Sequence, residues 1–174
     1  MRSLCNWRVK VARAIIGVLL ALCAGVAAHA ADNSGIEGTY RLISSTRTIV
    51  ATGQVEDAFG SDPIGYITYG KDHRMTVLIV KRDRPKPTFK TLNDAQKISL
   101  FDSMAAYCGT YTFDGKTVLH TIDASWNEIL TGTTQMRSVK KEGRRLSYTT
   151  TASPAPTDGQ ISTSTLIWEK VGDT

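Results

Sequence analysis

The sequence predicts an all-β protein in which about eight antiparallel strands form an up-and-down barrel or a sandwich, with one amphipathic helix. Short runs rich in Thr, Val, Ile and Tyr recur along the chain and are separated by Gly, Asp and Pro, which is the pattern of strands joined by turns. Most of the connections are short, as they are between antiparallel neighbours. A single stretch, residues 91–106, has no Gly or Pro and shows helical periodicity.

The first thirty residues have the features of a secretory signal peptide. Four basic side chains precede an apolar run at residues 14–28, and no acidic residue is present. That run is shorter than the roughly 18–20 residues of a membrane-spanning helix. Small residues at positions 28 and 30 fit a cleavage site, so we expect the exported chain to begin at Ala31, in the periplasm or the medium. Residues 31–37 are then a short linker before a single domain at 38–171.

Removal of residues 1–30 changes both the charge and the cysteine content. Four of the 21 basic residues, none of the 16 acidic residues and two of the three cysteines lie there, so the net charge falls from +5 to +1. We therefore expect no binding to nucleic acid at physiological salt. Cys108 alone cannot form an internal disulfide, so the hydrophobic core must stabilise the domain. The chain has no sequence motif of a phosphate-binding loop, a serine hydrolase or a zinc peptidase, and we expect neither a metal nor a cofactor.

The strands follow from the turn residues between them, in chain order. Gly70-Lys71-Asp72-His73 separates two strands, and Pro85 and Pro87 make residues 81–90 a loop. Asp114-Gly115 and Glu142-Gly143 each separate the two strands of a hairpin. Residues 53–63 and 153–160 are expected to be loops. The expected strands are residues 38–50, 64–69, 74–81, 107–113, 116–123, 133–141, 144–151 and 161–171.

The helix is expected over about residues 91–106. Thr91 with Asp94 resembles a capping box at its start. Apolar residues at helical spacing make it amphipathic. The apolar face is formed by Leu92, Ala95, Ile98, Phe101 and Ala105.

The register of the first hairpin places a histidine in the interior. With Asp114-Gly115 as a two-residue turn, Gly109 opposes His120, which leaves room for the imidazole or for a group lying over it, and opposed residues share a sheet face. One face is far more apolar and aromatic than the other, so we expect it to point inward. This face consists of Tyr107, Gly109, Tyr111, Phe113, Val118, His120 and Ile122.

The register of the second hairpin places an arginine and a glutamine in the interior. With Glu142-Gly143 as the turn, Arg137 opposes Tyr148 and Gln135 opposes Thr150. An inward arginine needs a partner. The alternatives are a structural ion pair, with Glu128 or Glu169 as the acid, and contact with an anionic or carbonyl-bearing ligand.

Inward side chains from separate hairpins converge on one cavity in a small barrel. We therefore expect one pocket that joins the polar groups of both hairpins. His120 is interpreted either as a core histidine bonded to a tyrosine or carbonyl, or as a ligand contact, and its ordinary pKa also suits acid–base chemistry. The expected pocket residues are Tyr111, His120, Arg137 and Tyr148 with Gln135 nearby, Trp126 at the rim, and Phe113, Val118 and Met75 in the apolar part.

Several segments resemble the bacterial and fungal lipocalin-like domain family, whose members are calycin-type β-barrels. Gly38-Thr39-Tyr40-Arg41-Leu42 resembles the Gly-x-Trp opening strand of lipocalins, with Tyr in place of Trp. The resemblance covers about residues 38–171 and implies a barrel with an internal pocket and a helix near one mouth. Residues 62–75, 106–111, 118–122, 132–137 and 166–169 carry the rest of the resemblance, in the family's order.

Three functions remain open at this stage. The favoured one is an exported barrel that binds a small, largely apolar ligand with one polar end. The second is an acid–base enzyme, an isomerase, cyclase or lyase, that uses the same pocket with His120 as proton shuttle. The third is a structural or interaction module without a ligand. No stable insertion into a membrane is expected after signal cleavage, and the sequence does not predict an oligomeric state.

Overall fold

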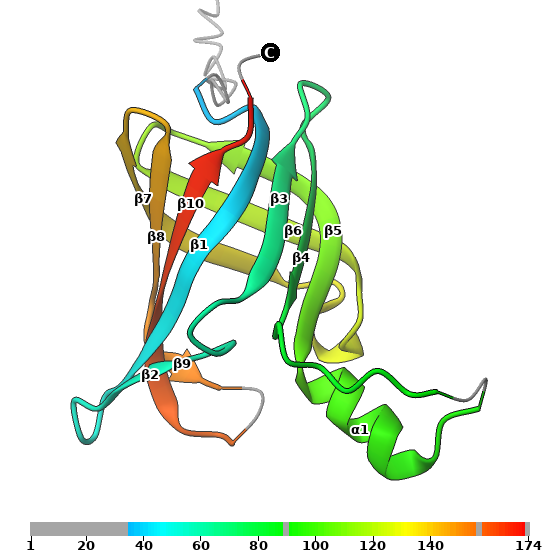
Figure 1. Ribbon diagram of the computed structural model, residues 1–174. Helices are drawn as coiled ribbons and strands as arrows, with labels where there is room; N and C mark the ends of the chain where they lie inside the picture. Colours follow the sequence, from blue (N-terminus) through cyan, green and yellow to red (C-terminus); the bar gives the residue numbers. More distant parts are fainter. Residues whose placement is uncertain (1–34, 89–90, 156–157, 173–174) are drawn as a thin grey trace, which may run out of the picture.

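The computed structural model describes residues 35–88, 91–155 and 158–172, and the predicted signal peptide and cleavage site lie outside these ranges. Eight strands form one antiparallel sheet that closes on itself, which confirms the up-and-down barrel rather than the sandwich (Figure 1). The last of these strands pairs with the first to complete the ring. In order around the barrel they are β1 (Gly38–Ile49), β3 (Ile64–Tyr69), β4 (Arg74–Val80), β5 (Met104–Phe113), β6 (Thr117–Ser125), β7 (Thr134–Glu142), β8 (Arg145–Thr150) and β10 (Ile161–Lys170).

Two short strands lie where the sequence predicts loops. β2 (Val55–Asp57) pairs with β1, and β9 (Ser153–Pro154) pairs with β10. Both lie at the same end of the barrel as helix α1 (Asp94–Asp102), which we call the helix end (Figure 1). The opposite end, which we call the terminal end, carries the end of β10 and the turns of the β3–β4, β5–β6 and β7–β8 hairpins (Figure 1).

The predicted helix is present but shorter than expected. The side chain of Asn93 accepts from the Gln96 amide while the Gln96 side chain accepts from the Asn93 amide, so this pair, not Thr91 with Asp94, forms the capping box. The helix ends early because residues 104–106 pair with β4. None of its side chains is buried, so its apolar face does not pack into the barrel.

Both predicted hairpin registers are wrong by two residues. The turns consist of Gly115-Lys116 and Gly143-Arg144, with glycine in the first position at φ values of 92° and 57°. Such turns suit the twist of paired strands, and positive φ at the first position favours glycine. Arg137 therefore pairs with Thr150 and not with Tyr148. Because side chains alternate with a period of two, this shift leaves every residue on its predicted face.

Gly109 has a different role from the predicted one. It pairs with Ile122, not with His120, and adjoins a bulge in β5. A Cβ atom at this position would lie 2.0 Å from the carbonyl oxygen of Thr121. Glycine is therefore required by the close approach of β5 and β6 at the bulge, not by space for the imidazole.

The terminal end of the barrel is filled by apolar and aromatic side chains. Tyr40, which stands in place of the Trp of the Gly-x-Trp opening strand, is buried there. Its ring contacts that of Tyr69 edge to face. This core makes the barrel solid at that end. Its buried members include Ile36, Tyr40, Leu42, Met75, Tyr111, Phe113, Val118 and Leu146.

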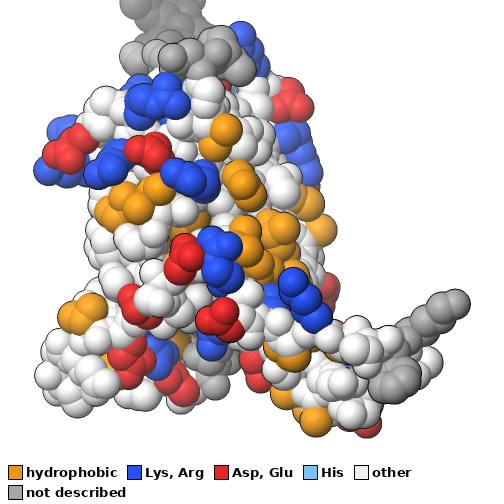
Figure 2. All heavy atoms as spheres, in the orientation of Figure 1, with side chains coloured by type: hydrophobic (Ala, Val, Ile, Leu, Met, Phe, Trp, Pro, Cys, Tyr) orange, Lys and Arg blue, Asp and Glu red, His pale blue; other side chains and the backbone are white. Residues whose placement is uncertain are grey.

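The outer surface mixes apolar and charged groups. In Figure 2, hydrophobic side chains gather over β3 and β4, with acidic and basic groups around them. Exposed members include Ile43, Ile64, Tyr66 and Leu78. In the described ranges no helix is both long enough and apolar enough to cross a bilayer.

Candidate functional site

A cavity of about 160 Å³ lies inside the barrel, in the half nearer the helix end. Strands β3, β4 and β10 and the segment after β2 supply an apolar wall, which includes Phe59. A cavity of about 150 Å³ holds a benzene molecule, so this space suits a small ligand. The lining residues are Ser45, Ala58, Phe59, Ile67, Val77, Ile79, Ala105, Tyr107, His120, Arg137, Tyr148, Thr150, Ser164, Leu166 and Trp168.

A chain of hydrogen bonds centred on His120 forms the polar wall. The Tyr148 hydroxyl donates to the Tyr69 oxygen over 2.9 Å. The Tyr69 oxygen lies 2.7 Å from Nε2 of His120, and the Tyr107 oxygen lies 3.2 Å from Nδ1. Four residues from four different strands are thus joined in one network.

The network has a preferred direction. Since the Tyr69 oxygen accepts from Tyr148, its own hydrogen points to Nε2 of His120, which accepts it. The ring hydrogen then lies on Nδ1 and is donated to Tyr107. The opposite tautomer would leave the Tyr69 hydrogen without an acceptor in a side chain that is 1% exposed.

Burial favours the uncharged forms of His120, Tyr69 and Tyr148. It lowers the pKa of His120 well below the ordinary 6.5, and the positive charge of Arg137 lowers it further. Burial raises the pKa of Tyr69 and of Tyr148 well above the ordinary 10.0. At neutral pH the network therefore consists of an imidazole and phenols, which exchange hydrogen bonds but carry no charge.

Among the described residues, Arg137 is the one charged group that lines the cavity, and no salt bridge is recorded for it there. Its Nη1 atom is buried without a hydrogen-bond partner among the described residues, and its Cζ lies 6.0 Å from the centre of the Tyr107 ring. Glu128 instead accepts from the Thr131 hydroxyl, and Glu169 pairs with Arg41 on the outer surface. The structural ion pair considered from the sequence is therefore wrong.

The structure brings together three of the predicted pocket residues and separates the others. His120, Arg137 and Tyr148 line the cavity, as their predicted inward faces require. Tyr111 lies at the terminal end, where its hydroxyl donates to the Gly70 carbonyl over 3.0 Å. Three predicted apolar contacts are also in the terminal core and not on the cavity wall: Phe113, Val118 and Met75.

The two remaining predicted pocket residues lie away from the cavity wall. Gln135 is half-buried and donates through Nε2 to the Thr133 hydroxyl over 3.0 Å. The indole N–H of Trp126 donates to the Phe101 carbonyl over 3.2 Å, next to α1. Trp126 therefore contacts the helix and does not line the cavity.

Sequence reasoning missed several residues of the cavity wall and of the hydrogen-bond network behind it. Tyr69 follows Ile67 at a spacing of two in β3, so its inward direction is visible in the alternation of that strand. Trp168 alternates with Leu166 in the same way, and its Nε1 is buried without a partner among the described residues. No comparable signal identifies Phe59, because it lies in an irregular segment.

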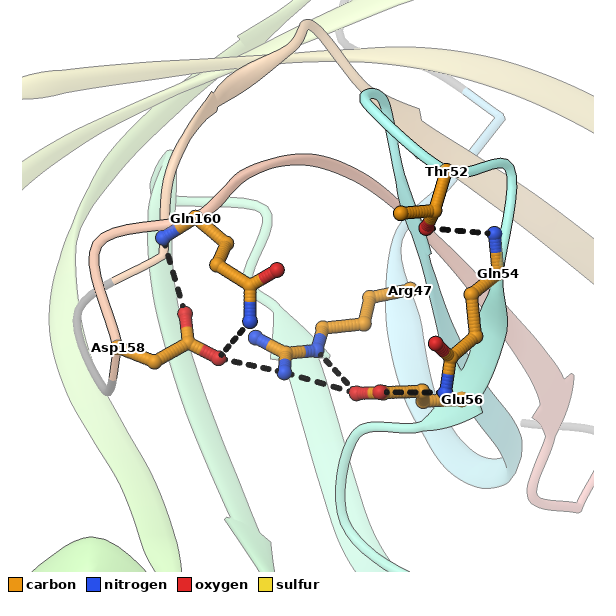
Figure 3. A network of polar contacts seen from close by, with 6 residues as sticks. All are labelled: Arg47, Thr52, Gln54, Glu56, Asp158 and Gln160. Carbon is orange, nitrogen blue, oxygen red and sulfur yellow. Dashed lines mark hydrogen bonds and ion pairs between the residues drawn. The ribbon is translucent and has the colours of Figure 1, made fainter.

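A cluster of ion pairs ties together the two short strands of the helix end (Figure 3). Arg47 of β1 donates to Glu56 of β2 over 2.8 Å and to Asp158, near β9, over 2.6 Å. The Arg47 side chain is 16% exposed, less than the basic partner of any other ion pair given for the described residues, so these pairs are better shielded from solvent. Glu56 precedes Ala58 and Phe59 of the cavity wall, so the cluster holds that segment against β1.

A larger groove on the outer surface is a weaker candidate. Its volume is about 330 Å³, and Arg41, Asp62, Tyr66 and Arg82 are among its lining residues. Arg82 is paired with Asp62, and Arg41 with Glu169, so its charges have partners within the protein. In the ranges described, no three His, Cys, Asp or Glu side chains are grouped as metal ligands.

Comparison with known proteins gives one family match, which covers the whole barrel. Residues 37–171 match the family model described as a lipocalin-like domain. The match spans every strand of the barrel and the helix. No curated protein matches the chain.

Proposed function

Since the chain belongs to the lipocalin-like domain family, we propose that it is an exported protein that binds a small, largely apolar ligand with one polar end inside the barrel. One observation carries this proposal: the cavity joins an apolar wall to the Arg137 cation, whose Nη1 has no hydrogen-bond partner in the part of the chain that the structure describes. Ligand pockets generally combine a mostly apolar lining with a few oriented polar groups. The apolar wall would hold the body of the ligand, and Arg137 with the His120 network would orient its polar end.

Export is part of the proposal and has its own test. The basic start, the short apolar run and the small residues at 28 and 30 support cleavage before Ala31. N-terminal sequencing of the protein from its own host should find Ala31 first. A chain that retains its first residues in the cell would contradict export without affecting the binding proposal.

Native mass spectrometry of the protein from its own host tests ligand binding. We expect an added mass of a small molecule that disappears when the protein is denatured. The same measurement on Arg137→Met should show less of the added mass, because the cation that orients the polar end is lost. Absence of any added mass, together with no binding of small apolar compounds in vitro, would favour the structural module without a ligand.

An acid–base enzyme is the second candidate, because His120 lies on the cavity wall. Both of its ring nitrogens are already hydrogen-bonded to tyrosine hydroxyls, and its lowered pKa makes it a weak base, so we favour binding. His120→Gln distinguishes the two functions. It should weaken binding modestly in a binding protein and abolish turnover in an enzyme.

A further inference from the structure

The hydrogen-bonding groups of the cavity wall have more hydrogens than acceptors. The chain from Tyr148 through Tyr69 and His120 ends on the Tyr107 oxygen, so the Tyr107 hydroxyl hydrogen has no acceptor among the described residues. Two further donors of the wall, Nη1 of Arg137 and the indole N–H of Trp168, also have no acceptor among the described residues. Arginine and tryptophan side chains can only donate hydrogen bonds, so these two groups can be satisfied only by an acceptor.

The same wall carries a positive charge without a negative one. Of the described side chains that line the cavity, none is Asp or Glu. The other polar groups of the lining, the hydroxyls of Ser45, Thr150 and Ser164, are neutral. The complementary ligand group therefore accepts several hydrogen bonds, donates none and carries one negative charge.

Among common organic groups, a carboxylate has these three properties. Amides, alcohols and amines would add donors to a wall that already has an excess of them. A ketone or aldehyde accepts hydrogen bonds but leaves the guanidinium charge unbalanced. A phosphate monoester carries up to two negative charges, which a single guanidinium does not match.

We propose that the cavity binds a small monocarboxylate with a compact apolar body, whose carboxylate accepts hydrogen bonds from Arg137 and the Tyr107 hydroxyl. This inference rests on the proposed function that the cavity holds a small ligand. The body of the ligand lies against Ile67, Val77 and Leu166. At about 160 Å³, the cavity accommodates a body about the size of a benzene ring.

Three probes that share one ring test the carboxylate: benzoate, benzamide and toluene. Each is titrated into the protein at neutral pH by isothermal titration calorimetry. A hydrogen-bonded ion pair shielded from solvent should make benzoate bind at least about tenfold more tightly than benzamide or toluene. Equal binding of the three probes would overturn the carboxylate while leaving the proposed function in place.

Variants of the two donors locate the preference for benzoate. In Arg137→Met, the affinity for benzoate should fall to the affinity for toluene, and the affinity for toluene should be unchanged. Tyr107→Phe removes only a hydroxyl group and should weaken benzoate about fivefold or more. If Arg137→Met does not fold, Arg137→Lys keeps the charge without the planar fork and should retain only part of the preference.

Matched controls on the outer surface complete the design. Arg145→Met and Tyr66→Phe make the same chemical changes at exposed positions and should not alter any of the three affinities. A benzoate preference that survives Arg137→Met would overturn the inference. Failure of all three probes to bind the unmodified protein would contradict the inference and the proposed function together.

Discussion

At neutral pH the imidazole of His120 carries no charge, and this property makes the stability of the barrel depend on pH. In the unfolded chain His120 has its ordinary pKa of 6.5, whereas in the barrel burial and the charge of Arg137 lower it. As the pH falls through 6.5, the unfolded chain takes up a proton that the folded protein does not. The free energy of unfolding should therefore fall by up to about 1.4 kcal/mol per pH unit.

Urea denaturation between about pH 5 and pH 7.5 measures this dependence. His120→Gln should flatten the slope below pH 6.5, because the titrating group is gone. His73→Asn is the control, since it removes an exposed histidine at the β3–β4 turn and should leave the slope unchanged. A slope that is the same in His120→Gln as in the unmodified protein would contradict a neutral, buried His120.

The hydroxyl of Tyr69 is the central link of the interior network. Tyr69→Phe would leave Nε2 of His120 without a donor and the Tyr148 hydroxyl without its acceptor. We expect a loss of about 1–3 kcal/mol in the free energy of unfolding, measured by urea denaturation. Tyr66→Phe, on the same strand but 46% exposed, should cost almost nothing. Similar losses in both variants would mean that the network does not stabilise the fold.

Among the elements, the two short strands of the helix end should depend on Arg47. Arg47→Met removes the cation that joins Glu56 to Asp158. We expect the free energy of local opening of the segment after β2 to fall by about 1 kcal/mol, which raises the population of the open state about fivefold. Hydrogen exchange of the Ala58 amide, which donates to the Ser45 carbonyl over 2.9 Å, reports this opening.

The exposed pair of Arg41 and Glu169 supplies the control for that measurement. Arg41 is 56% exposed, so Arg41→Met should leave exchange at Ala58 unchanged. Exchange throughout β5 and β6 should also be unchanged in Arg47→Met. Faster exchange there would show that Arg47 stabilises the whole barrel and not one segment.

The hairpins show which parts of the fold can be predicted from sequence. Alternation of apolar side chains fixes the inner face of a strand, so His120 and Arg137 are correctly placed inside. The tip of a hairpin is less certain, since Asp-Gly and Gly-Lys are both acceptable turns and differ in register by two residues. The sequence therefore predicts which side chains enter the barrel better than it predicts their height along its axis.

This uncertainty in height explains the errors in the predicted site. Phe113, Val118 and Met75 share the inner face with His120 but lie at the terminal end. Alternation cannot distinguish the two ends of a strand, because both satisfy the same periodicity. Phe59 and α1 are different cases, because tertiary contacts and local capping, not periodicity, determine where they lie.

For the whole molecule, closure of the sheet joins the first and last strands. The amide of Val171 donates to the Thr39 carbonyl over 2.8 Å, so the two ends of the domain lie side by side at the terminal end. A circular permutant that links Gly172 to Gly35 and opens the chain between Gly115 and Lys116 should fold to the same barrel. Its free energy of unfolding should be lower, because the β5–β6 hairpin becomes a non-local pairing.

Two measurements check the permutant. Its circular dichroism and its amide chemical shifts away from the new ends should match those of the unpermuted domain. A matched permutant opened inside β1, between Ser44 and Ser45, should fail to fold, because β1 pairs with β10, β2 and β3. If both permutants fold equally well, β1 is not essential to closure of the barrel.

The division of the barrel into a solid terminal end and a hollow helix end has a consequence for how such proteins can diverge. Nine of the fourteen buried residues of the hydrophobic core lie outside the wall of the cavity, and five belong to both: Ile67, Val77, Ile79, Tyr148 and Trp168. Small wall residues such as Ala58, Ala105 and Ser164 can be exchanged for larger ones, or larger ones trimmed, with modest risk to folding. Natural selection can thus alter the shape of the cavity through these positions while the core and the turns of the terminal end are inherited unchanged.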